Sequence, residues 1–286
     1  MNSVELFAPA KVNLYLHVTG RREDGYHLLD SLVVFAGTGD LLRFAPDDKL
    51  TLTLEGSEAW LLTADDNNLV LRAARLLAEA LGRPALAAIT LEKNLPVASG
   101  IGGGSADAAA TLRGLLTLWE AELDEAKLAE IGLKLGADLP VCLAGRPTQM
   151  SGIGETLTPA IELPPAWLVL VNPRIALSTP AVFKARTGDF TPAAPLTGQV
   201  PDAEALADAL ESRRNDLAHP AVMLEPAVAA MLAAIATTQG CLLARMSGSG
   251  ATCFGLYADE ETADNAADAL RAAHPGWWIS PAPILP

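Results

Sequence analysis

A glycine-rich segment at residues 96–105 contains the residue types best suited to chemistry, because it reads PVASGIGGGS and leads into an alanine-rich stretch. Glycines let several backbone N–H groups point into one concavity, and a following helix adds its positive end, so the segment suits a di- or triphosphate. It is not a Walker A loop, since no Lys-Ser or Lys-Thr pair follows, and Ser105 replaces the third glycine of the dinucleotide pattern. A flexible turn or a helix C-cap is the alternative, but the density of glycines favours phosphate binding.

A second glycine segment, SGSGAT at residues 247–252, lies between two expected strands. By itself it favours a hairpin whose glycines adopt positive φ. The functional alternative is that its N–H groups face the first glycine segment.

Two charged residues stand beside apolar stretches. Lys11 begins an apolar strand, where an ammonium group needs an anionic partner, although a lysine that protects a strand edge fits equally well. Asp138 fits the N-cap of a short helix as well as it fits a functional role.

Tyr26 and His27 follow a turn, and a lone histidine is more often structural than a ligand. The histidines show no metal-ligand spacing, so no zinc site is expected.

The composition is that of a globular protein of 286 residues, half of them apolar. Its 20 basic and 34 acidic residues give a net charge of −14, which argues against nucleic acid and anionic lipid as partners. Backbone N–H groups could still hold a phosphorylated small molecule locally. Three scattered cysteines predict neither disulfides nor zinc. No leader pattern or long apolar run occurs, so we expect a cytoplasmic protein without a membrane partner.

Hydrophobic periodicity predicts the elements of the first half of the chain. Alternating β-branched runs predict an antiparallel or mixed sheet over residues 4–7, 11–19, 28–35, 41–44, 50–54 and 88–93. Helical spacing with caps predicts helices over residues 68–81, 105–119 and 124–135. The middle helix carries alanine on every face of its first turns, which predicts that it is buried.

A change of texture near residue 155 predicts two domains, at residues 1–155 and 156–286. The second is expected to be α+β, because strand and helix patterns are mixed along it. Strands are expected over residues 167–171, 242–246 and 251–257, and helices over 203–210, 226–238 and 261–273. The proline-rich residues 191–201 predict a surface loop.

Three segments in this order resemble the GHMP kinase superfamily, which includes galactokinase, homoserine kinase and mevalonate kinase. They are PAKVNL at residues 9–14, the glycine segment continued to residue 109, and MSGSGA at residues 246–251. Within the superfamily, RREDGYHL at 21–28, LGADLP at 135–140 and NDL at 215–217 are similar to the family that phosphorylates the 2-hydroxyl of cytidine diphosphate-methylerythritol, a step of the non-mevalonate route to isoprenoid precursors.

This resemblance, which spans nearly the whole chain, implies a two-domain α+β GHMP kinase fold. It implies an N-terminal ribosomal-protein-S5-like α/β domain, a C-terminal α+β domain and an active site in the cleft between them. Asp138 would accept the hydroxyl proton, and Lys11 would keep Asp138 ionised and stabilise the developing charge. ATP and Mg²⁺ are the implied cofactors, without an assigned metal ligand. A monomer and a homodimer both remain open.

The resemblance also assigns binding residues. Those implied for the nucleotide are Asn68, Leu69, Lys93, Pro96, Val97, Ala98, Ser99, Gly100, Ile101, Gly102, Gly103, Gly104, Ser105 and Ala106. Those implied for the substrate are Asn13, Gly248, Ser249, Gly250 and, at the cytosine ring, Tyr26, His27 and Phe183.

The chain departs from the family pattern, which usually has glycines at Ala98 and Ser99, leucine at Ile101 and Ser-Asn at residues 106–107. The carboxylate of Asp107 suits the helix dipole but repels a nearby phosphate unless it faces magnesium or solvent. We expect this change to affect nucleotide affinity while the phosphate cradle is retained.

Two alternative functions remain. One is a GHMP kinase of the homoserine or mevalonate type, against which the cytosine features Tyr26, His27 and Phe183 argue. The other is a non-catalytic nucleotide-binding module, against which a pair of Lys11 with Asp138 would argue.

Overall fold

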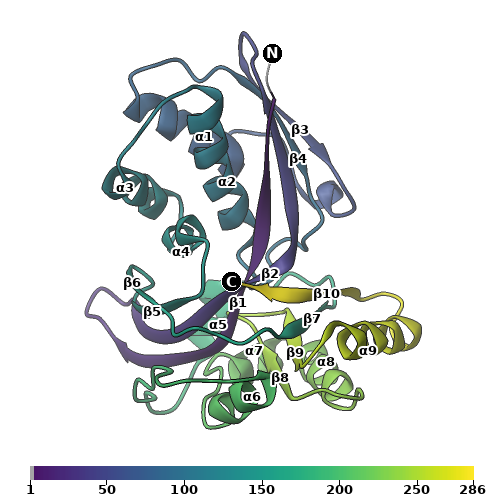
Figure 1. Ribbon diagram of the computed structural model, residues 1–286. Coiled ribbons are helices and arrows are strands. Elements are labelled where there is room, and N and C mark those ends of the chain that lie inside the picture. Colours follow the sequence, from purple (N-terminus) through teal and green to yellow (C-terminus); the bar gives the residue numbers. More distant parts are fainter. Residues whose placement is uncertain (1–2) are drawn as a thin grey trace. The chain divides into compact units, whose positions relative to one another are not determined.

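The chain folds into two compact units, which the computed structural model describes for residues 3–286 (Figure 1). Among these, unit 1 contains residues 3–10, 39–97 and 102–144, and unit 2 contains residues 11–38, 98–101 and 145–286. The long strands β1 (Val4–Arg21) and β2 (His27–Ala45) contribute residues to both units. The predicted domains, residues 1–155 and 156–286, are continuous in sequence, whereas each unit combines several segments of the chain. The boundary after residue 155 stays a prediction.

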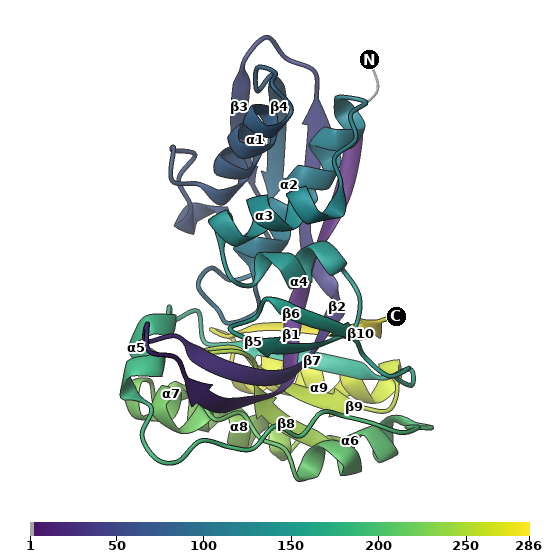
Figure 2. The ribbon, with the colours of Figure 1, turned by 90° about the vertical axis from the view of Figure 1, so that its left-hand side faces the viewer.

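Unit 1 is a mixed sheet that carries helices on one side. β3 (Leu50–Glu55) runs parallel to β4 (Ala87–Glu92), and β4 runs antiparallel to residues 41–45 of β2. Figures 1 and 2 both place α1, α2 and α3 on the same side of these strands. The helical elements of unit 1 are η1 (Ala59–Leu61), α1 (Leu69–Ala80), α2 (Gly103–Leu118), α3 (Glu125–Leu135) and α4 (Leu139–Ala144).

Unit 2 is built on an antiparallel sheet in the order β2-β10-β7-β9-β8, with the β5–β6 hairpin paired to β2. Helix α8 packs on β8 and β9, and helix α9 packs on β7 and β10. The strands are β5 (Thr148–Gly152), β6 (Thr156–Pro159), β7 (Trp167–Asn172), β8 (Leu243–Met246), β9 (Cys253–Tyr257) and β10 (Trp278–Leu285). The helices are α5 (Thr179–Ala185), α6 (Ala203–Glu211), α7 (Ala218–Leu224), α8 (Ala227–Ala236) and α9 (Glu260–Ala273).

Small side chains bury helix α2 against the sheet of unit 1. Its alanines at 106 and 108–110 are all buried, as the sequence predicted. Gly114 allows a still closer contact, because a Cβ there would lie 2.3 Å from a ring carbon of the buried Phe44. The position of α2 on the sheet therefore depends on the absence of a side chain at one point.

Several predicted strands are wrong in extent. The expected strands at 28–35 and 41–44 are joined in β2, because the glycines between them allow close packing rather than a turn. A Cβ at Gly39 would lie 2.3 Å from the carbonyl oxygen of Ala8, and one at Gly37 would lie 2.9 Å from the ring of Pro283. The expected strands at 4–7 and 11–19 are likewise joined in β1.

Other elements begin elsewhere or were not predicted. Helix α2 begins at Gly103, two residues before its expected start at 105. Helices α5 and α7 and strands β5 and β6 were not predicted, since segments of four to seven residues carry little periodicity. Helix α4 is the short helix that the sequence allowed after Asp138. Strand β10 was missed because Pro281 and Pro283 argue against a strand.

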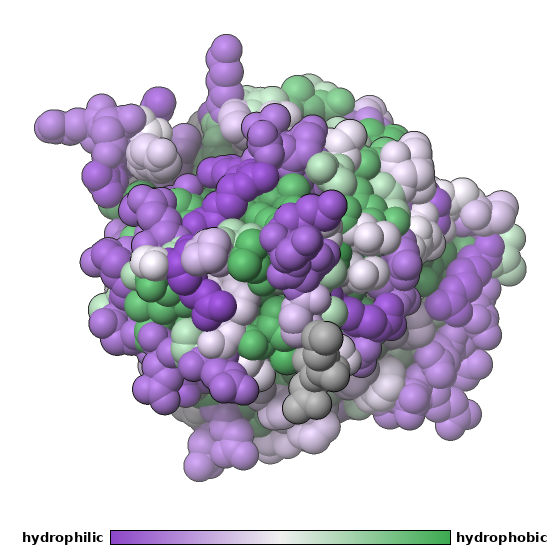
Figure 3. Space-filling model, turned by 90° about the horizontal axis from the view of Figure 1, so that it is seen from above, coloured by the Kyte–Doolittle hydropathy of each residue, from purple (hydrophilic) through white to green (hydrophobic). Residues whose placement is uncertain are grey.

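No helix within residues 3–286 is long and apolar enough to cross a membrane. On the face shown in Figure 3, hydrophobic residues lie in areas that hydrophilic residues interrupt. Large apolar side chains are exposed in each unit at two adjacent positions: Trp60 and Leu61 in unit 1, and Met223 and Leu224 in unit 2.

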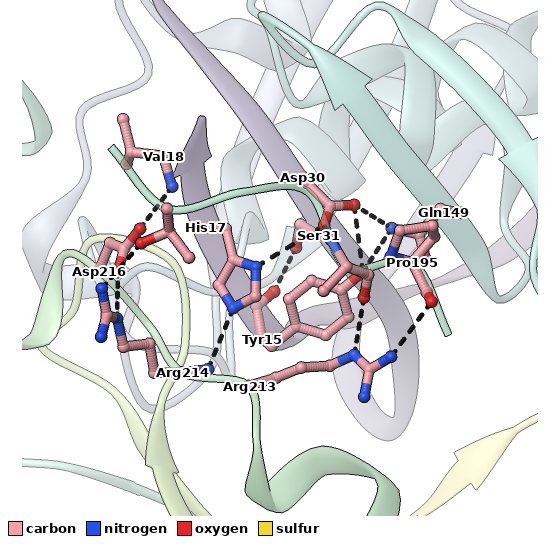
Figure 4. A network of polar contacts seen from close by, with 12 residues as sticks. Tyr15, His17, Val18, Asp30, Ser31, Gln149, Pro195, Arg213, Arg214 and Asp216 are labelled. Atoms are coloured by element: carbon pink, nitrogen blue, oxygen red, sulfur yellow. Dashed lines mark hydrogen bonds and ion pairs between the residues drawn. The ribbon is translucent and has the colours of Figure 1, made fainter. Parts of the chain in front are cut away.

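A buried polar network fixes the proline-rich loop of residues 191–201 within unit 2 (Figure 4). Asp30 accepts hydrogen bonds from Tyr15 Oη at 3.1 Å and from the backbone N–H of Ala194 at 2.6 Å. Arg213 Nε donates to the carbonyl oxygen of Ala194 at 2.7 Å. The surface loop that the prolines predicted is therefore held at Ala194, where side chains bond both the backbone N–H and the carbonyl oxygen.

His17 is a buried member of this network (Figure 4). Its Nδ1 lies 3.7 Å from Asp30 Oδ2, and its Nε2 accepts a hydrogen bond from the backbone N–H of Arg214. Burial lowers the pKa of His17, and Arg214 and Arg213 act in the same direction, while Asp216 and Asp30 oppose the shift. At a pH between the pKa of His17 in the folded protein and its pKa in the unfolded chain, the imidazole is therefore protonated mainly in the unfolded chain.

We expect His17 to reduce the free energy of unfolding as the pH falls below about 6.5, because the unfolded chain then binds a proton that the folded chain does not. The loss is at most about 1.4 kcal/mol per pH unit. Urea unfolding at several pH values should show a shallower decline for His17→Gln than for the unchanged protein. The exposed His219→Gln serves as the control, and an unchanged slope in His17→Gln would contradict the argument.

Gly114→Ala should destabilise the protein by about 2 kcal/mol, although alanine is the better helix former, because the added Cβ overpacks against Phe44. Thr117→Ala, at an exposed position of the same helix, gives the matched control and should change stability by less than about 0.5 kcal/mol. Chemical unfolding of both variants measures the difference. Equal stability of the two variants would mean that Phe44 moves aside without cost.

Candidate active site

The two glycine segments meet within unit 2, along residues 99–101 and 247–252. Ser99 O accepts the backbone N–H of Thr252 at 3.0 Å, and Gly100 O accepts Ser247 Oγ at 3.1 Å. A Cβ at Gly100 would lie 2.6 Å from Gly250 O, so no other residue fits without a shift. The second segment is the hairpin between the antiparallel strands β8 and β9, and its Gly248 and Gly250 adopt positive φ, as the sequence favoured. It also lies against the first glycine segment, as the functional alternative requires.

Lys11 and Asn13 of β1 lie beside this contact. The buried Lys11 donates its backbone N–H to Ile101 O at 2.9 Å. Asn13 donates its backbone N–H to Ser247 Oγ at 3.1 Å and its Nδ2 to Ser31 Oγ at 2.8 Å. Within the part of the chain that the structure describes, the buried Oδ1 of Asn13 has no hydrogen-bond partner. This carbonyl oxygen is suited to accept a hydrogen bond from a ligand.

In unit 1, the first turn of α2 forms the other part of the glycine segment. Gly102 is the N-cap in the left-handed conformation, with φ of 64°, and Gly104 is exposed. The first amides of an α-helix have no partner within the helix, and the helix dipole is positive there. Leu69 packs at this turn, because its Cδ1 lies 3.2 Å from the position of a Cβ at Gly104. Leu69 and the glycines of the first turn thus lie together at the N-terminal end of α2.

Lys93 has a different environment from the one expected for a ligand of the adenine ring. Its Nζ donates to Asp40 Oδ2 at 2.5 Å and to Asp107 Oδ2 at 2.7 Å, and all three residues are buried. Burial disfavours the ammonium, but Asp107 and Asp40 outweigh this effect and raise the pKa of Lys93. Burial also raises the pKa of Asp107 to about 7.

Asp107 does not face solvent: it is buried in unit 1 and contacts Lys93, an arrangement that its neighbours in the sequence did not indicate. Asp40 was missed by the sequence analysis. The signal that could have found it is the one used for Lys11: an ionisable residue inside an apolar strand needs a partner.

The remaining nucleotide residues have mostly structural contacts. Asn68 caps α1 by accepting the Val70 N–H at 3.0 Å, and its Nδ2 donates to Thr63 O. Pro96 is buried and Val97 is half-buried, while Ala98 adopts a positive φ of 52°. Ala98 therefore holds a backbone conformation that glycine would adopt with less strain.

Asp138 immediately precedes helix α4, and its carbonyl oxygen accepts the Cys142 N–H at 3.2 Å. The side chain is half-buried. Asp138 belongs to unit 1 and Lys11 to unit 2, so their pairing stays a prediction.

Two of the three predicted cytosine residues are in contact within unit 2. The rings of His27 and Phe183 stack with centroids 4.9 Å apart and an angle of 23°. Burial lowers the pKa of His27, and Arg21 and Arg186 add to the effect, so the imidazole is neutral near pH 7. Tyr26 is 59% exposed.

Helix α5 links the aromatic pair to the second glycine segment. Thr179, four residues before Phe183 on the same helix, shares a hydrogen bond of 2.7 Å between its Oγ1 and Ser249 Oγ. Thr179 was not among the predicted site residues, because a single threonine in a helix carries no sequence signal.

No group of three His, Cys, Asp or Glu side chains within residues 3–286 is placed to hold a metal ion. The acid nearest the first turn of α2 in sequence, Asp107, is already bound by Lys93. A metal ion that accompanies a nucleotide would depend mainly on phosphate oxygens and water, as Mg²⁺ commonly does.

Comparison with known proteins supports a kinase fold. Family models described as GHMP kinases N terminal domain and GHMP kinases C terminal match residues 68–146 and 195–276. The solved homoserine kinase of Cytophaga hutchinsonii shares the fold, with a TM-score of 0.68, 18% identity, and coverage of 99% of this chain and 95% of that one.

Similarity to one kinase family extends over the full length. A 4-diphosphocytidyl-2-C-methyl-D-erythritol kinase from Paramagnetospirillum magneticum is 61% identical over 285 residues, covering 100% of both chains, and one from Rhodospirillum rubrum is 57% identical, covering 98% of this chain and 92% of that relative. The crystal structure of a 4-(cytidine 5'-diphospho)-2C-methyl-D-erythritol kinase matches with a TM-score of 0.81 and 37% identity over 98% of each chain. The chain therefore belongs to the 4-diphosphocytidyl-2-C-methyl-D-erythritol kinase family, within the GHMP kinases.

Proposed function

We propose that the protein transfers the γ-phosphoryl group of ATP to the 2-hydroxyl of 4-diphosphocytidyl-2-C-methyl-D-erythritol, in the non-mevalonate route to isoprenoid precursors. The observation that carries this proposal is the 61% identity to a kinase of that name over the entire chain. The product would be the 2-phosphate, with ADP released.

The first turn of α2 and the adjoining glycine segment are proposed to bind the ATP phosphates. Their amides offer hydrogen bonds that need no basic side chain, which suits a chain with a net charge of −14. Mg²⁺ is proposed to accompany ATP, where it would neutralise part of the charge on the β- and γ-phosphates. Asn68, Leu69 and the backbone around Lys93 are proposed to border the adenine ring.

Lys11 and Asp138 are proposed as the catalytic pair. Asp138 would accept the proton of the attacking hydroxyl, and Lys11 would favour the ionised carboxylate and stabilise the charge that develops on the transferred group. Lys11 is buried beside the paired glycine segments, which supports a role close to the phosphates.

The cytosine ring is proposed to bind at Tyr26, His27 and Phe183. A neutral imidazole can both donate and accept a hydrogen bond, which suits the polar edge of cytosine. Asn13 and residues 248–250 are proposed to contact the rest of the substrate, since Asn13 Oδ1 has no partner among the described residues.

A cytoplasmic location and a monomer or homodimer remain part of the proposal. Kinases of the homoserine or mevalonate type share the fold at 11–18% identity, and the stacked His27 and Phe183 favour the cytidylyl substrate over theirs.

Asp138→Asn should lower kcat by about 100-fold or more while the Kd for ATP changes by less than about two-fold, since it removes only the proton acceptor. The assay is ADP release from MgATP with 4-diphosphocytidyl-2-C-methyl-D-erythritol, beside homoserine and mevalonate. Asp124→Asn is the matched control, because asparagine can still cap α3. Full turnover in Asp138→Asn would remove Asp138 from the mechanism, and turnover with homoserine or mevalonate alone would overturn the substrate.

Phe183→Ala should raise the KM for the cytidylyl substrate by about ten-fold and change kcat by less than about two-fold, because stacking stabilises ground state and transition state alike. Met223→Ala, an exposed apolar side chain elsewhere in unit 2, is the control for general loss of apolar surface. Steady-state kinetics at saturating ATP separates the two constants. An unchanged KM in Phe183→Ala would exclude stacking on this ring.

A further inference from the structure

A buried ionic cluster in unit 1 joins three elements around one ammonium group. Lys93 directly follows β4, Asp40 lies in β2 and Asp107 lies in the second turn of α2. The three side chains are between 0% and 4% exposed. Lys93 Nζ bridges the two carboxylates, 2.5 Å from Asp40 Oδ2 and 2.7 Å from Asp107 Oδ2.

The cluster also fixes the chain that leads into the glycine segment. Asp40 Oδ1 accepts the backbone N–H groups of Asn94 at 2.6 Å and Leu95 at 2.8 Å. One carboxylate therefore orients both the lysine side chain and the two residues after it. Asp107 Oδ1 has no hydrogen-bond partner among the described residues, so Lys93 is what holds the Asp107 carboxylate.

The cluster lies directly beneath the first turn of α2. A Cβ placed on Gly103 would lie 3.1 Å from Lys93 Nζ and 3.6 Å from side-chain carbons of Leu95. The first backbone bond of the helix, from Ala106 N–H to Gly102 O at 2.8 Å, spans the same turn. The glycine at 103 thus brings the helix backbone into contact with the ammonium group.

Stability alone does not explain such a cluster. A buried ion pair recovers only part of the desolvation penalty, and apolar side chains of similar volume are often as stabilising. The excess of one carboxylate makes the arrangement costlier, which fits the raised pKa of Asp107. The cluster does fix the direction and depth of the first turn of α2, which apolar packing would do less specifically.

We propose that Asp40, Lys93 and Asp107 act together as positioning residues, which hold the amides of residues 103–105 in the orientation that nucleotide phosphates require. This inference rests on the proposed nucleotide site. It assigns the Lys93 ammonium to support beneath the phosphates rather than to contact with ATP. Asp107 takes part through Lys93 and touches no substrate.

Asp107→Ala should raise the Kd for ATP by about ten-fold, because the loss of a charge-assisted hydrogen bond loosens the first turn. Asp107→Asn should recover most of the affinity, staying within about three-fold of the unchanged protein, because its amide oxygen still accepts a bond from Lys93. The KM for the cytidylyl substrate should stay unchanged in both. Calorimetric titration with the non-hydrolysed product ADP and with ATP gives Kd directly, without turnover.

Thr111→Val is the matched control, since Thr111 Oγ1 donates to the backbone oxygen of Asp107 and not to its side-chain carboxylate. It should lower Tm without changing the Kd for ATP. An unchanged Kd in folded Asp107→Ala would reduce the cluster to a structural role and overturn the proposal, as would equal weakening in Asp107→Asn. If Asp107→Ala does not fold, two other variants test the proposal. One is Asp107→Asn, and the other combines Asp107→Leu with Lys93→Met in the same chain. The double variant should lose the affinity for ATP that Asp107→Asn retains. Wild-type protein that binds ATP without phosphorylating the substrate would overturn the proposed function alone.

Discussion

The close approach of two glycine segments in unit 2 is the constraint on which the candidate site depends. Gly100, Gly248 and Gly250 have φ of 77°, 54° and 83°, and a Cβ at any of them would lie 2.6 to 2.8 Å from its neighbours. Because backbone meets backbone here, the residues bonded to either segment are located as well. Lys11 is placed through Ile101 O. A side chain at Gly100 would therefore displace the predicted catalytic lysine without touching it.

Buried side chains satisfy the backbone where strands and helices end. Asn215 Nδ2 donates to Met246 O at 2.7 Å and to Gly248 O at 2.8 Å, next to the second glycine segment. Arg245 donates to Leu210 O, in the last turn of α6, at 3.1 Å, and although burial lowers its pKa to about 10, it stays charged near neutral pH. A buried carbonyl without a partner costs free energy, so these side chains allow irregular backbone to persist inside unit 2. The glycine contact and its polar surroundings thus form one structure.

The sequence predicted what short-range chemistry determines. The glycine segments, the cap Asp124 and the buried alanine helix each depend on a few neighbouring residues, and each is found. Partnerships across the sheet were harder to predict. Asp40 and Lys93 lie 53 residues apart, so their contact depends on the register of β2 and β4. The same effect of distance applies to Asp107, whose partner in space, Lys93, lies 14 residues away in the sequence.

An acidic protein can bind a triphosphate because the attraction is local. At physiological salt, exposed charges more than about 8 Å away are largely screened, so the net charge of −14 weighs little at a helix end. The amides of the first turn of α2 act only at hydrogen-bond distance and only in the right direction. If ATP binds at this turn as proposed, its affinity depends on how firmly the turn is oriented, which is a property of the residues that support it rather than of surface charge. A buried lysine can serve binding in this way through the backbone that it holds.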